Sequence, residues 1–446
     1  MLRDLPNPLH ETNVALTRQQ ARTIFEYALA ECSISKAFGR CVGFEDGQLQ
    51  VGANRYDLSA FAATAVVSIG KAGHSMAAAL SSVIPIGAGG IVACPDAPKS
   101  PVGGFRYFYG GHPLPNEDSL RAGEAILELL HGLPPQSLVL FLISGGASAI
   151  AEKPMCADLT LSDVIETNRA LVLSGAPIAE INAIRKHLSA TKGGRMAKAA
   201  APATQVSMLV SDVPDHALDA LASGPSMPDS STVADCYAIA RRYDLLSKLP
   251  ERVRSIFVDE ELLETPKPGD AAFANSRYVT VLSNQSAVEA AAVHAKGLGF
   301  KVEIDNSCDD WDYARTGDYL LTRLKELRQE SSRVCLISGG EVTVTVTSKT
   351  GVGGRNQQFA LYCAEKIAGE AITVMSAGTD GIDGNSLAAG AIVDGTTVGR
   401  ARQRNFDVAS AISGFDAFPL VNAIGDAIVT GPTGNNVRDL RILLAY

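Results

Sequence analysis

The chain has 446 residues and a net charge of −9, with 46% hydrophobic and 20% charged residues. This length exceeds one ordinary hydrophobic core, so we expect two domains. The acidic balance and the lack of a basic stripe argue against nucleic-acid binding. No apolar run approaches the roughly 18 residues that a membrane-spanning helix needs. Eight scattered cysteines without a CxxC pair favour reduced core thiols, and with no leader-like N-terminus we expect a cytoplasmic protein.

Helix and strand patterns alternate through the first part of the chain. Helical periodicity is predicted over 13–40, 74–80 and 117–131, and for most of 161–200. Apolar runs predict strands at 65–69, 90–94, 105–109, 137–143 and 205–210. Alternation of this kind predicts a mostly parallel, doubly wound sheet.

A surface connection with Pro266, Pro268 and Gly269 interrupts this pattern, so we place the domains at 1–265 and 266–446. Beyond it the predicted strands are 278–282, 301–304, 333–337, 341–348, 372–376 and 440–444, and the predicted helices are 285–295, 318–328 and 356–367. The strand at 341–348 is expected to be antiparallel, because valines and threonines alternate strictly along it.

The pentapeptide Leu-Ile-Ser-Gly-Gly occurs at 142–146 and again at 336–340. Each copy follows an apolar run, which is typical of a buried parallel strand that ends in a tight glycine turn. Ligands of open α/β sheets bind beyond the carboxyl ends of strands. We therefore expect both turns to offer backbone N–H groups to an anionic ligand. The residues concerned are Ser144, Gly145, Gly146 and Ser148 in the first turn, and Gly339 and Gly340 in the second.

Gly70 and Lys71 lie between a predicted strand and a predicted helix. A glycine, a lysine and a helix N-terminus together form a plausible phosphate site. The spacing matches neither a Walker A loop nor a GxGxxG dinucleotide motif. An ordinary strand–helix turn with a surface lysine explains the segment equally well.

Two further segments offer cations. Arg185 and Arg195 belong to the densest basic stretch, where adjacent glycines favour an anion site over the usual solvated helix face. Arg355 follows a glycine-rich turn and opens a predicted helix, where a planar guanidinium suits a phosphoryl or carboxylate group. Alternatively, Arg355 is merely solvated and Asn356 only caps the helix.

Candidate carboxylates follow the strands. Asp212 comes directly after a predicted strand, where it could contact a metal or accept a proton, or simply cap a helix. Glu341 follows the second pentapeptide. Asp380 lies between glycines, where it could hold Mg²⁺ or only form an Asp-Gly turn.

Taken in order, these segments resemble the glycerate 2-kinase family, whose C-terminal part is the MOFRL domain. The motifs that carry the resemblance are Gly70-Lys71-Ala72, Gly111-His112-Pro113-Leu114-Pro115, Ser144–Ser148, Asn182–Arg195, Ser211-Asp212-Val213, Ser223-Gly224-Pro225, Gly339-Gly340-Glu341, Gly354-Arg355-Asn356-Gln357 and Thr379-Asp380-Gly381. They span nearly the whole chain.

The resemblance implies ATP-dependent phosphorylation of D-glycerate to 2-phospho-D-glycerate, with ATP and Mg²⁺ as cofactors. It also implies an α/β fold with a Rossmann-like N-terminal domain, a smaller α/β MOFRL domain, and an active site in the cleft between them. The family's catalytic lysine and arginine match Lys71 and Arg355. Small molecules are then the only expected partners, and the chain is a monomer or a homodimer.

Within this hypothesis Lys71 and Arg355 stabilise the transferring phosphoryl group. Asp212 contacts Mg²⁺ or accepts the hydroxyl proton, with Glu341 and Asp380 as second choices, and Arg185 or Arg195 binds the substrate carboxylate. The chain departs from the family pattern in two places. Leu387 stands where an acidic residue is usual, and the sequence Asn435-Asn436-Val437-Arg438 replaces a Thr-Asn-Val-Asn-like stretch.

Two other functions remain open. A hydroxypyruvate reductase is disfavoured by the missing GxGxxG motif. A metabolite-binding sensor without catalysis is disfavoured by the presence of Lys71, Arg355 and Asp212.

Overall fold

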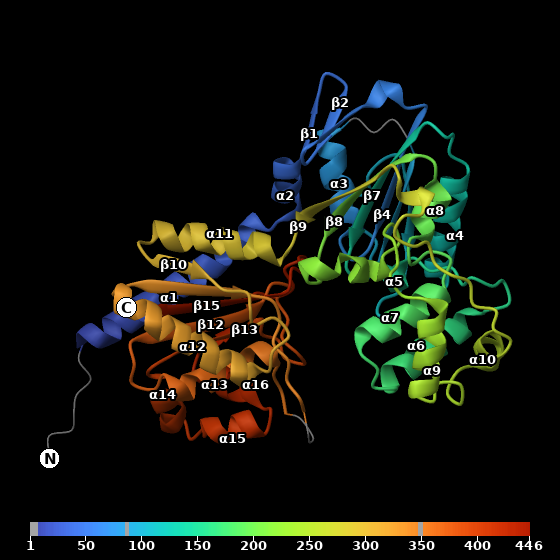
Figure 1. Cartoon of the computed structure of the whole chain (residues 1–446). Helices are drawn as coiled ribbons and strands as arrows, with labels where there is room; N and C mark the ends of the chain where they lie inside the picture. The colour runs from blue at the N-terminus through green and yellow to red at the C-terminus, as the bar shows by residue number, and fades with distance from the viewer. Residues whose placement is uncertain (1–7, 85–88, 347–350) are drawn as a thin grey trace, which may run out of the picture. The chain divides into compact units, whose positions relative to one another are not determined.

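The computed structural model describes residues 8–84, 89–346 and 351–446. The chain divides into two compact units (Figure 1). The central unit is Ile34–Val281, and the terminal unit combines the chain up to Ser33 with Leu282–Tyr446. No described helix is long and apolar enough to cross a membrane.

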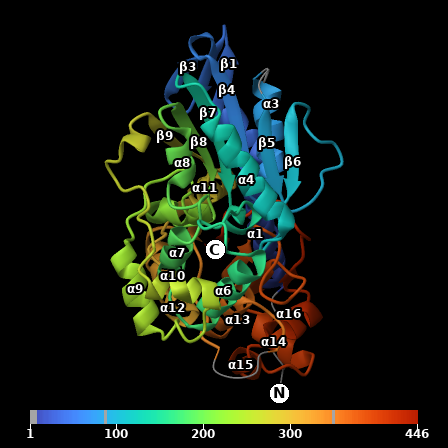
Figure 2. The ribbon, with the colours of Figure 1, turned by 90° about the vertical axis from the view of Figure 1, so that its right-hand side faces the viewer.

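The central unit is built on a six-stranded sheet in the order β6-β5-β4-β7-β8-β9. Its strands are β4 (Ala63–Ile69), β5 (Gly90–Cys94), β6 (Phe105–Tyr109), β7 (Ser137–Ser144), β8 (Thr204–Val210) and β9 (Ser276–Leu282). The pairings β4–β5, β5–β6, β4–β7 and β7–β8 are parallel. The order can be followed across Figure 2 from β6 on the right to β9 on the left.

This order confirms the expected doubly wound sheet. The first two strands that follow β4 in the chain lie on one side of it, whereas β7 and its successors lie on the other. The direction of winding therefore reverses between β4 and β7, which is where open α/β sheets bind ligands. β7 is buried along its whole length, as its continuous apolar sequence predicts.

Helices cover this sheet and form a second cluster beside it. α3 (Gly73–Val83), α4 (Glu117–His131), α5 (Ala147–Ile150) and α8 (Arg195–Ala200) belong to the sheet layers. α6 (Leu161–Leu173), α7 (Ile178–His187), α9 (Val233–Arg242) and α10 (Glu251–Val258) share a separate apolar core. A small antiparallel sheet of β1 (Val42–Glu45), β2 (Gln48–Val51) and β3 (Asn54–Asp57) follows α2 (Ile34–Cys41).

The terminal unit has a mixed sheet in the order β10-β11-β15-β12-β13-β14. Its strands are β10 (Lys301–Ile304), β11 (Val334–Gly339), β12 (Ile372–Gly378), β13 (Gly390–Asp394), β14 (Ala427–Ile428) and β15 (Asp439–Ala445). Among the strand pairs described in this sheet, β10 and β11 run parallel and all others run antiparallel. The last strand of the chain, β15, lies between β11 and β12.

Helices cover both faces of the terminal sheet (Figure 1). α1 (Pro8–Glu31) and α11 (Asn284–Gly297) pack on one face, and α12 (Tyr313–Glu330) and α13 (Arg355–Lys366) on the other. The short helices α14 (Thr397–Gln403), α15 (Val408–Ser413) and α16 (Ala417–Ala423) follow β13. Successive residues of β15 point to opposite faces of the sheet. Ile442 packs in the core beneath α1, and Leu443 packs in the core beneath α13.

Three expectations differ from the structure. The predicted helix over 13–40 is two helices that are interrupted at Cys32–Ser33. The division lies at 33/34 and 281/282 and not at 265/266. Ile24 and Phe25 of α1 pack in the core of the terminal unit, and β9 belongs to the sheet of the central unit. The predicted strand over 341–348 is wrong for residues 341–346, and residues 347–348 lie outside the described part. β11 already pairs with β10 and β15, and residue Thr343 of the segment makes only an isolated parallel bridge with Asp312.

Candidate functional site

The loops that follow β4 and β7 interlock where the winding reverses. The Lys71 N–H donates to the Gly145 carbonyl oxygen over 2.9 Å, and the Ala72 N–H donates to Ser144 Oγ over 3.0 Å. Gly70 has φ +119°, and a Cβ atom there would lie 2.3 Å from Ser144 Oγ. Ser144 therefore holds the loop of Lys71 in place, and only glycine fits at position 70.

Three side chains pack against the glycine turn that follows β7. A Cβ atom at Gly145 would lie 2.0 Å from Asp212 Oδ2. A Cβ atom at Gly146 would lie 2.9 Å from His112 Cδ2 and 3.1 Å from Lys71 Cγ. The fold thus brings Lys71, His112 and Asp212, from three different loops, to one turn.

This turn offers backbone donors. Within the described part of the chain, the N–H groups of Gly145 and Gly146 have no hydrogen-bond acceptor. Two adjacent N–H groups beside a lysine form a site that suits an oxyanion. The donors of the first pentapeptide are therefore available, and their binding of an anion stays a prediction.

The second pentapeptide turn is different, and the expectation of free donors there is wrong. The N–H groups of Gly339 and Gly340 donate to the side-chain oxygens of Asn306 and Asn284, each over 2.8 Å. The next N–H group, that of Glu341, donates to Asp309 Oδ1 over 2.9 Å. Side chains of the terminal unit therefore occupy all three donors.

A pocket of about 220 Å³ lies beside the first turn in the central unit. Its lining residues are His112, Pro113, Gly146, Ser148, Ala149, Glu152, Asn168, Arg185 and Lys192. This volume is below the roughly 300–1,000 Å³ typical of drug-sized ligands. The pocket therefore suits a small molecule.

The charged groups of this pocket are partly paired. Lys192 is 2% exposed, and its ammonium group pairs with Glu152, which also accepts a hydrogen bond from Ser189 Oγ over 2.5 Å. Burial lowers the pKa of Lys192, although Glu152 opposes that effect. Two cations and one carboxylate line the pocket, so it has one excess positive charge at neutral pH.

Arg185 carries this excess charge. Its Nε donates to Asn168 Oδ1 over 2.6 Å, a neutral partner that fixes the plane of the guanidinium. Burial lowers the pKa of Arg185, and the charge of Glu152 opposes the effect. An anion in the pocket would complete its pairing.

Arg195 does not line this pocket. Its NH2 group donates to the Leu263 carbonyl oxygen over 2.9 Å, and burial lowers the pKa of its guanidinium. Of the two arginines expected to bind a carboxylate, the structure brings only Arg185 together with Ser148.

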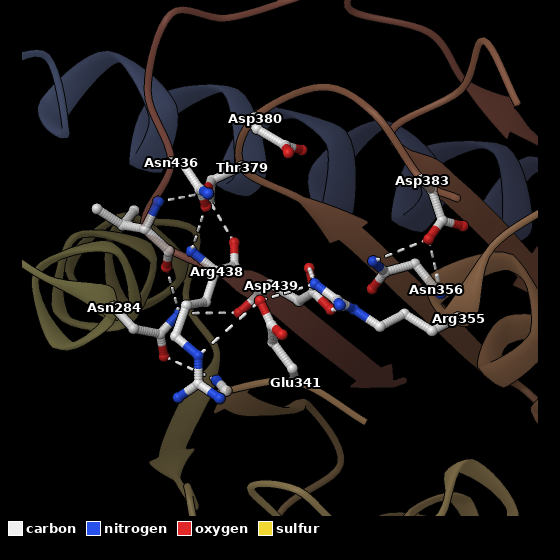
Figure 3. Close-up of polar contacts among 12 residues, drawn as sticks. Asn284, Glu341, Arg355, Asn356, Thr379, Asp380, Asp383, Asn436, Arg438 and Asp439 are labelled. Atoms are coloured by element: carbon white, nitrogen blue, oxygen red, sulfur yellow. Dashed lines mark hydrogen bonds and ion pairs between the residues drawn. The ribbon is translucent and has the colours of Figure 1, made fainter. Parts of the chain in front are cut away.

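In the terminal unit Arg355 lies between two carboxylates (Figure 3). It bonds Asp439 through Nε over 2.6 Å and through NH2 over 3.1 Å, and its NH2 group lies 2.7 Å from Glu341 Oε1. Burial disfavours the charged guanidinium, but the hydrogen bonds with Asp439 outweigh it and raise the pKa of Arg355. Burial and the charge of Asp439 also raise the pKa of Glu341.

The departure from the family pattern at 435–438 contributes to this cluster. Arg438 is 5% exposed and makes a two-pronged pair with Asp309, with both contacts at 2.6 Å. Its backbone N–H donates to Asn436 Oδ1 over 3.1 Å (Figure 3). Arg438 Nε also lies 4.0 Å from Glu341 Oε1. Arg438 therefore supports the carboxylate that Arg355 contacts.

Asn356 is buried, and its polar groups bond other side chains of the terminal unit. It is 1% exposed, its N–H donates to Asp383 Oδ1 over 3.1 Å, and its Oδ1 accepts from Ser376 Oγ over 2.6 Å. Asp383 also accepts from the Gln357 N–H over 2.9 Å and so caps α13. Burial outweighs these hydrogen bonds and raises the pKa of Asp383 to about 6. The N–H groups of Asn356 and Gln357, at the N-terminus of α13, therefore already have an acceptor within the chain.

Asp380 lies near Asp439: a Cβ atom at Gly378 would lie 3.0 Å from Asp380 Oδ1 and 3.4 Å from Asp439 Oδ1. Its Oδ1 accepts from the Ile382 N–H over 3.0 Å within its own turn. In the described ranges, no three His, Cys, Asp or Glu side chains are grouped to hold a metal ion. Mg²⁺ commonly binds one or two carboxylates together with substrate phosphates. Single carboxylates such as Asp212 or Asp380 fit that mode.

Sequence reasoning missed several residues of these clusters. They are Glu152, Asn168 and Lys192 in the pocket, His112 beside Lys71, and Asp309, Arg438 and Asp439 around Arg355. His112 lies in a motif that carried the resemblance, and this was the available signal for it. Lys192 also lies in such a motif, Asn182–Arg195, and Arg438 belongs to the departure from the family pattern at 435–438. The remaining residues come from segments without a local motif.

Comparison with known proteins supports both units. Residues 334–439 match the MOFRL family, and residues 20–258 match a domain of unknown function, DUF4147. A protein of Agrobacterium vitis named putative hydroxypyruvate reductase is 39% identical, over 85% of this chain and 86% of its own length. D-glycerate 2-kinase of Thermotoga maritima is 36% identical, over 84% and 89%. A crystal structure of glycerate kinase from the same organism superimposes with a TM-score of 0.83, at 32% identity over 97% of this chain and all of that one.

Proposed function

This chain belongs to the glycerate kinase family that carries the MOFRL domain, and from that premise we propose that it phosphorylates D-glycerate at the 2-hydroxyl with ATP. The products are 2-phospho-D-glycerate and ADP. A bond forms between the hydroxyl oxygen and the γ-phosphorus, the bond to the β-phosphate oxygen breaks, and the hydroxyl proton leaves.

The first glycine turn carries this proposal. Lys71 lies with the N–H groups of Gly145 and Gly146 beyond the ends of β4 and β7, and these N–H groups have no acceptor in the described ranges. Phosphoryl transfer depends mainly on positioning and on neutralising charge at the phosphoryl oxygens. A lysine and two backbone donors supply that charge stabilisation.

The remaining roles follow from the pocket and from the family. Arg185 binds the substrate carboxylate, because its guanidinium has no anionic hydrogen-bond partner among the described residues. Arg355 is the second proposed catalytic cation. Mg²⁺ would neutralise the nucleotide phosphates, with Asp212 or Asp380 as the protein carboxylate that contacts it.

Reduction of hydroxypyruvate is the second candidate, and one relative's name favours it. The strand order of the central unit also occurs in dinucleotide-binding folds. The first strand–helix turn opposes this function, because it reads Ile69-Gly70-Lys71-Ala72-Gly73 and lacks the GxGxxG spacing that lets a pyrophosphate approach.

One pair of assays separates these functions. Purified protein is given D-glycerate with Mg-ATP while ADP is followed, and hydroxypyruvate with NADH while absorbance at the NADH band is followed. We expect ADP release that requires D-glycerate, and no NADH oxidation. Glycerol, which lacks the carboxylate, is the control acceptor and should release little ADP. NADH oxidation alone would replace the kinase with the reductase, and silence in both assays would favour the non-catalytic sensor.

A further inference from the structure

We propose that the His112 imidazole accepts the proton of the substrate hydroxyl during phosphoryl transfer. This inference rests on the proposed kinase function. It assigns a catalytic base where the sequence pointed only to Asp212, and its basis is the pocket that His112 shares with Arg185.

His112 is free to act on a ligand. It is exposed, it lines the pocket, and it has no hydrogen-bond partner in the parts of the chain that the structure describes. Its ring packs against the Gly146 backbone, where a Cβ atom would lie 3.2 Å from Nε2. The imidazole is therefore held beside the turn that offers backbone donors to the phosphoryl group.

Desolvation and the charge of Lys71 favour the neutral form of His112. Lys71 packs against the same glycine, and Arg185 and Lys192 outnumber Glu152 in the pocket. Desolvation, together with the positive charge of Lys71, holds the pKa of His112 below its ordinary value of 6.5. A neutral imidazole has one nitrogen that can accept a proton at pH 7.

The substrate's own geometry brings its hydroxyl to this base. In a 2-hydroxy acid the carboxylate and the hydroxyl stand on adjacent carbons. A pocket of about 220 Å³ leaves a three-carbon acid little room to move once Arg185 holds its carboxylate. The hydroxyl then lies in the same small pocket as His112.

Asp212 is less well placed for proton transfer. Its carboxylate packs against Gly145, and it is not among the residues that line the pocket. In the proposed step the hydroxyl oxygen attacks the γ-phosphorus, the proton passes to the free imidazole nitrogen, and ADP departs. Asp212 keeps the role of contacting Mg²⁺.

Steady-state kinetics of His112→Gln test this assignment. Glutamine keeps hydrogen-bonding capacity but does not titrate, so the variant separates proton transfer from substrate positioning. We expect kcat to fall by about 10²- to 10⁴-fold, the usual contribution of general acid–base catalysis, while the KM for D-glycerate changes little. His131→Gln, at the exposed end of α4, is the matched control and should keep wild-type kinetics.

The pH profile supplies the second readout, at saturating Mg-ATP. A base must be unprotonated, so the kcat of the wild type should fall as pH drops through the lowered pKa of His112. This acidic limb should persist in Asp212→Asn and vanish in His112→Gln. An unchanged thermal unfolding midpoint would show that His112→Gln is folded.

The outcomes separate the two proposals. If the wild type releases no ADP with D-glycerate, the kinase function fails, and this inference fails with it. If the wild type is active and His112→Gln retains its kcat or its acidic limb, the base is not His112 and the kinase function stands.

Discussion

Lys71 owes its position to the residues around it. Gly70, at φ +119°, turns the chain out of β4, and the Lys71 N–H is anchored on the Gly145 carbonyl. The side chain then packs on Gly146, in the turn whose N–H groups have no acceptor among the described residues. Each contact depends on a residue that the sequence motifs had identified, so local sequence pointed to the residues that hold Lys71 in place, while its role in a site stays a prediction.

We expect Lys71→Ala to lower kcat by about 10²- to 10³-fold, because the variant removes a charged donor from the transferring phosphoryl group. The side chain is exposed, so the fold should survive. Lys99→Ala, an exposed lysine in the loop after β5, is the matched control. The rate of ADP release from each protein at saturating substrates measures the effect. Wild-type turnover by Lys71→Ala would show that this lysine takes no part in the mechanism.

Other residues of the site could not be read from sequence. The donors of Gly339 and Gly340 looked available because a local motif does not show which distant side chains approach it. Asn284 and Asn306 come from segments more than 30 residues away and occupy those donors. The pairing of Arg355 with Asp439 could not be predicted for the same reason, because Asp439 lies 84 residues further along the chain.

At the scale of elements, the two pentapeptides form the same local turn in different sheets. Gly146 has φ +82° and Gly340 has φ +85°, both in the left-handed region that favours glycine. β7 lies between two parallel neighbours, whereas β11 has the antiparallel β15 on one side. Local sequence therefore predicted strand and turn correctly, whereas the side chains of Asn306, after β10, and Asn284, in α11, decided that the donors of the second turn are occupied.

α1 shows a long-range element contact that periodicity did not reveal. Arg18 bonds Asp394 over 2.5 Å and Asp426 over 2.6 Å, and both carboxylates have fully buried side chains. Arg400 bonds the same two carboxylates. Burial opposes ionisation of Asp394, but hydrogen bonds from Thr396 and the two arginines outweigh it and lower its pKa. This network fastens the helix to the end of the terminal sheet.

We expect Arg18→Ala to lower the free energy of unfolding of the terminal unit by about 3–5 kcal/mol, since it leaves buried carboxylates short of a partner. The single tryptophan, Trp311, lies in this unit, so its fluorescence during urea unfolding measures the effect. Gln19→Ala, exposed on the same helix, is the control and should change little.

The stability difference between wild type and Arg18→Ala should depend on pH, because the pKa of Asp394 is lowered in the folded protein. A carboxylate with a lowered pKa stabilises the fold above the ordinary carboxyl value of 3.8 and loses this contribution as pH falls through its folded value. The gap between wild type and Arg18→Ala should therefore narrow in acid. A gap that stayed constant or widened would contradict the ion-pair account.

At the scale of the whole molecule, the chain begins and ends in the same unit. α1 covers one face of the terminal sheet, and β15 lies in the middle of that sheet. The proline- and glycine-rich segment at 266–269 pointed to a boundary because it marks a local turn. The true division depends on where α1 packs, which is information that no local signal holds.

This organisation predicts the behaviour of fragments. A fragment of residues 34–281 contains its own sheet and core, so it should unfold cooperatively when followed by circular dichroism. A fragment of residues 282–446 exposes the surface that Ala21, Ile24, Phe25 and Ala28 cover, all at most 1% exposed. Burying an isoleucine or phenylalanine is worth about 1.5–3 kcal/mol, so this fragment should unfold without a sharp transition.

Adding a peptide of residues 8–33 to the 282–446 fragment should restore a cooperative Trp311 transition. A peptide of the same composition in scrambled order is the control. A sharp transition in the 282–446 fragment alone, unaltered by the peptide, would show that α1 is dispensable for the terminal unit.

The position of phosphorylation tests the central claim most directly. Enolase converts 2-phosphoglycerate to phosphoenolpyruvate and does not act on 3-phosphoglycerate. Incubating the protein with D-glycerate and Mg-ATP, then adding enolase without a mutase, should produce absorbance of phosphoenolpyruvate in proportion to the ADP released. ADP release with no phosphoenolpyruvate would show transfer to another position, and no ADP release would contradict the kinase itself.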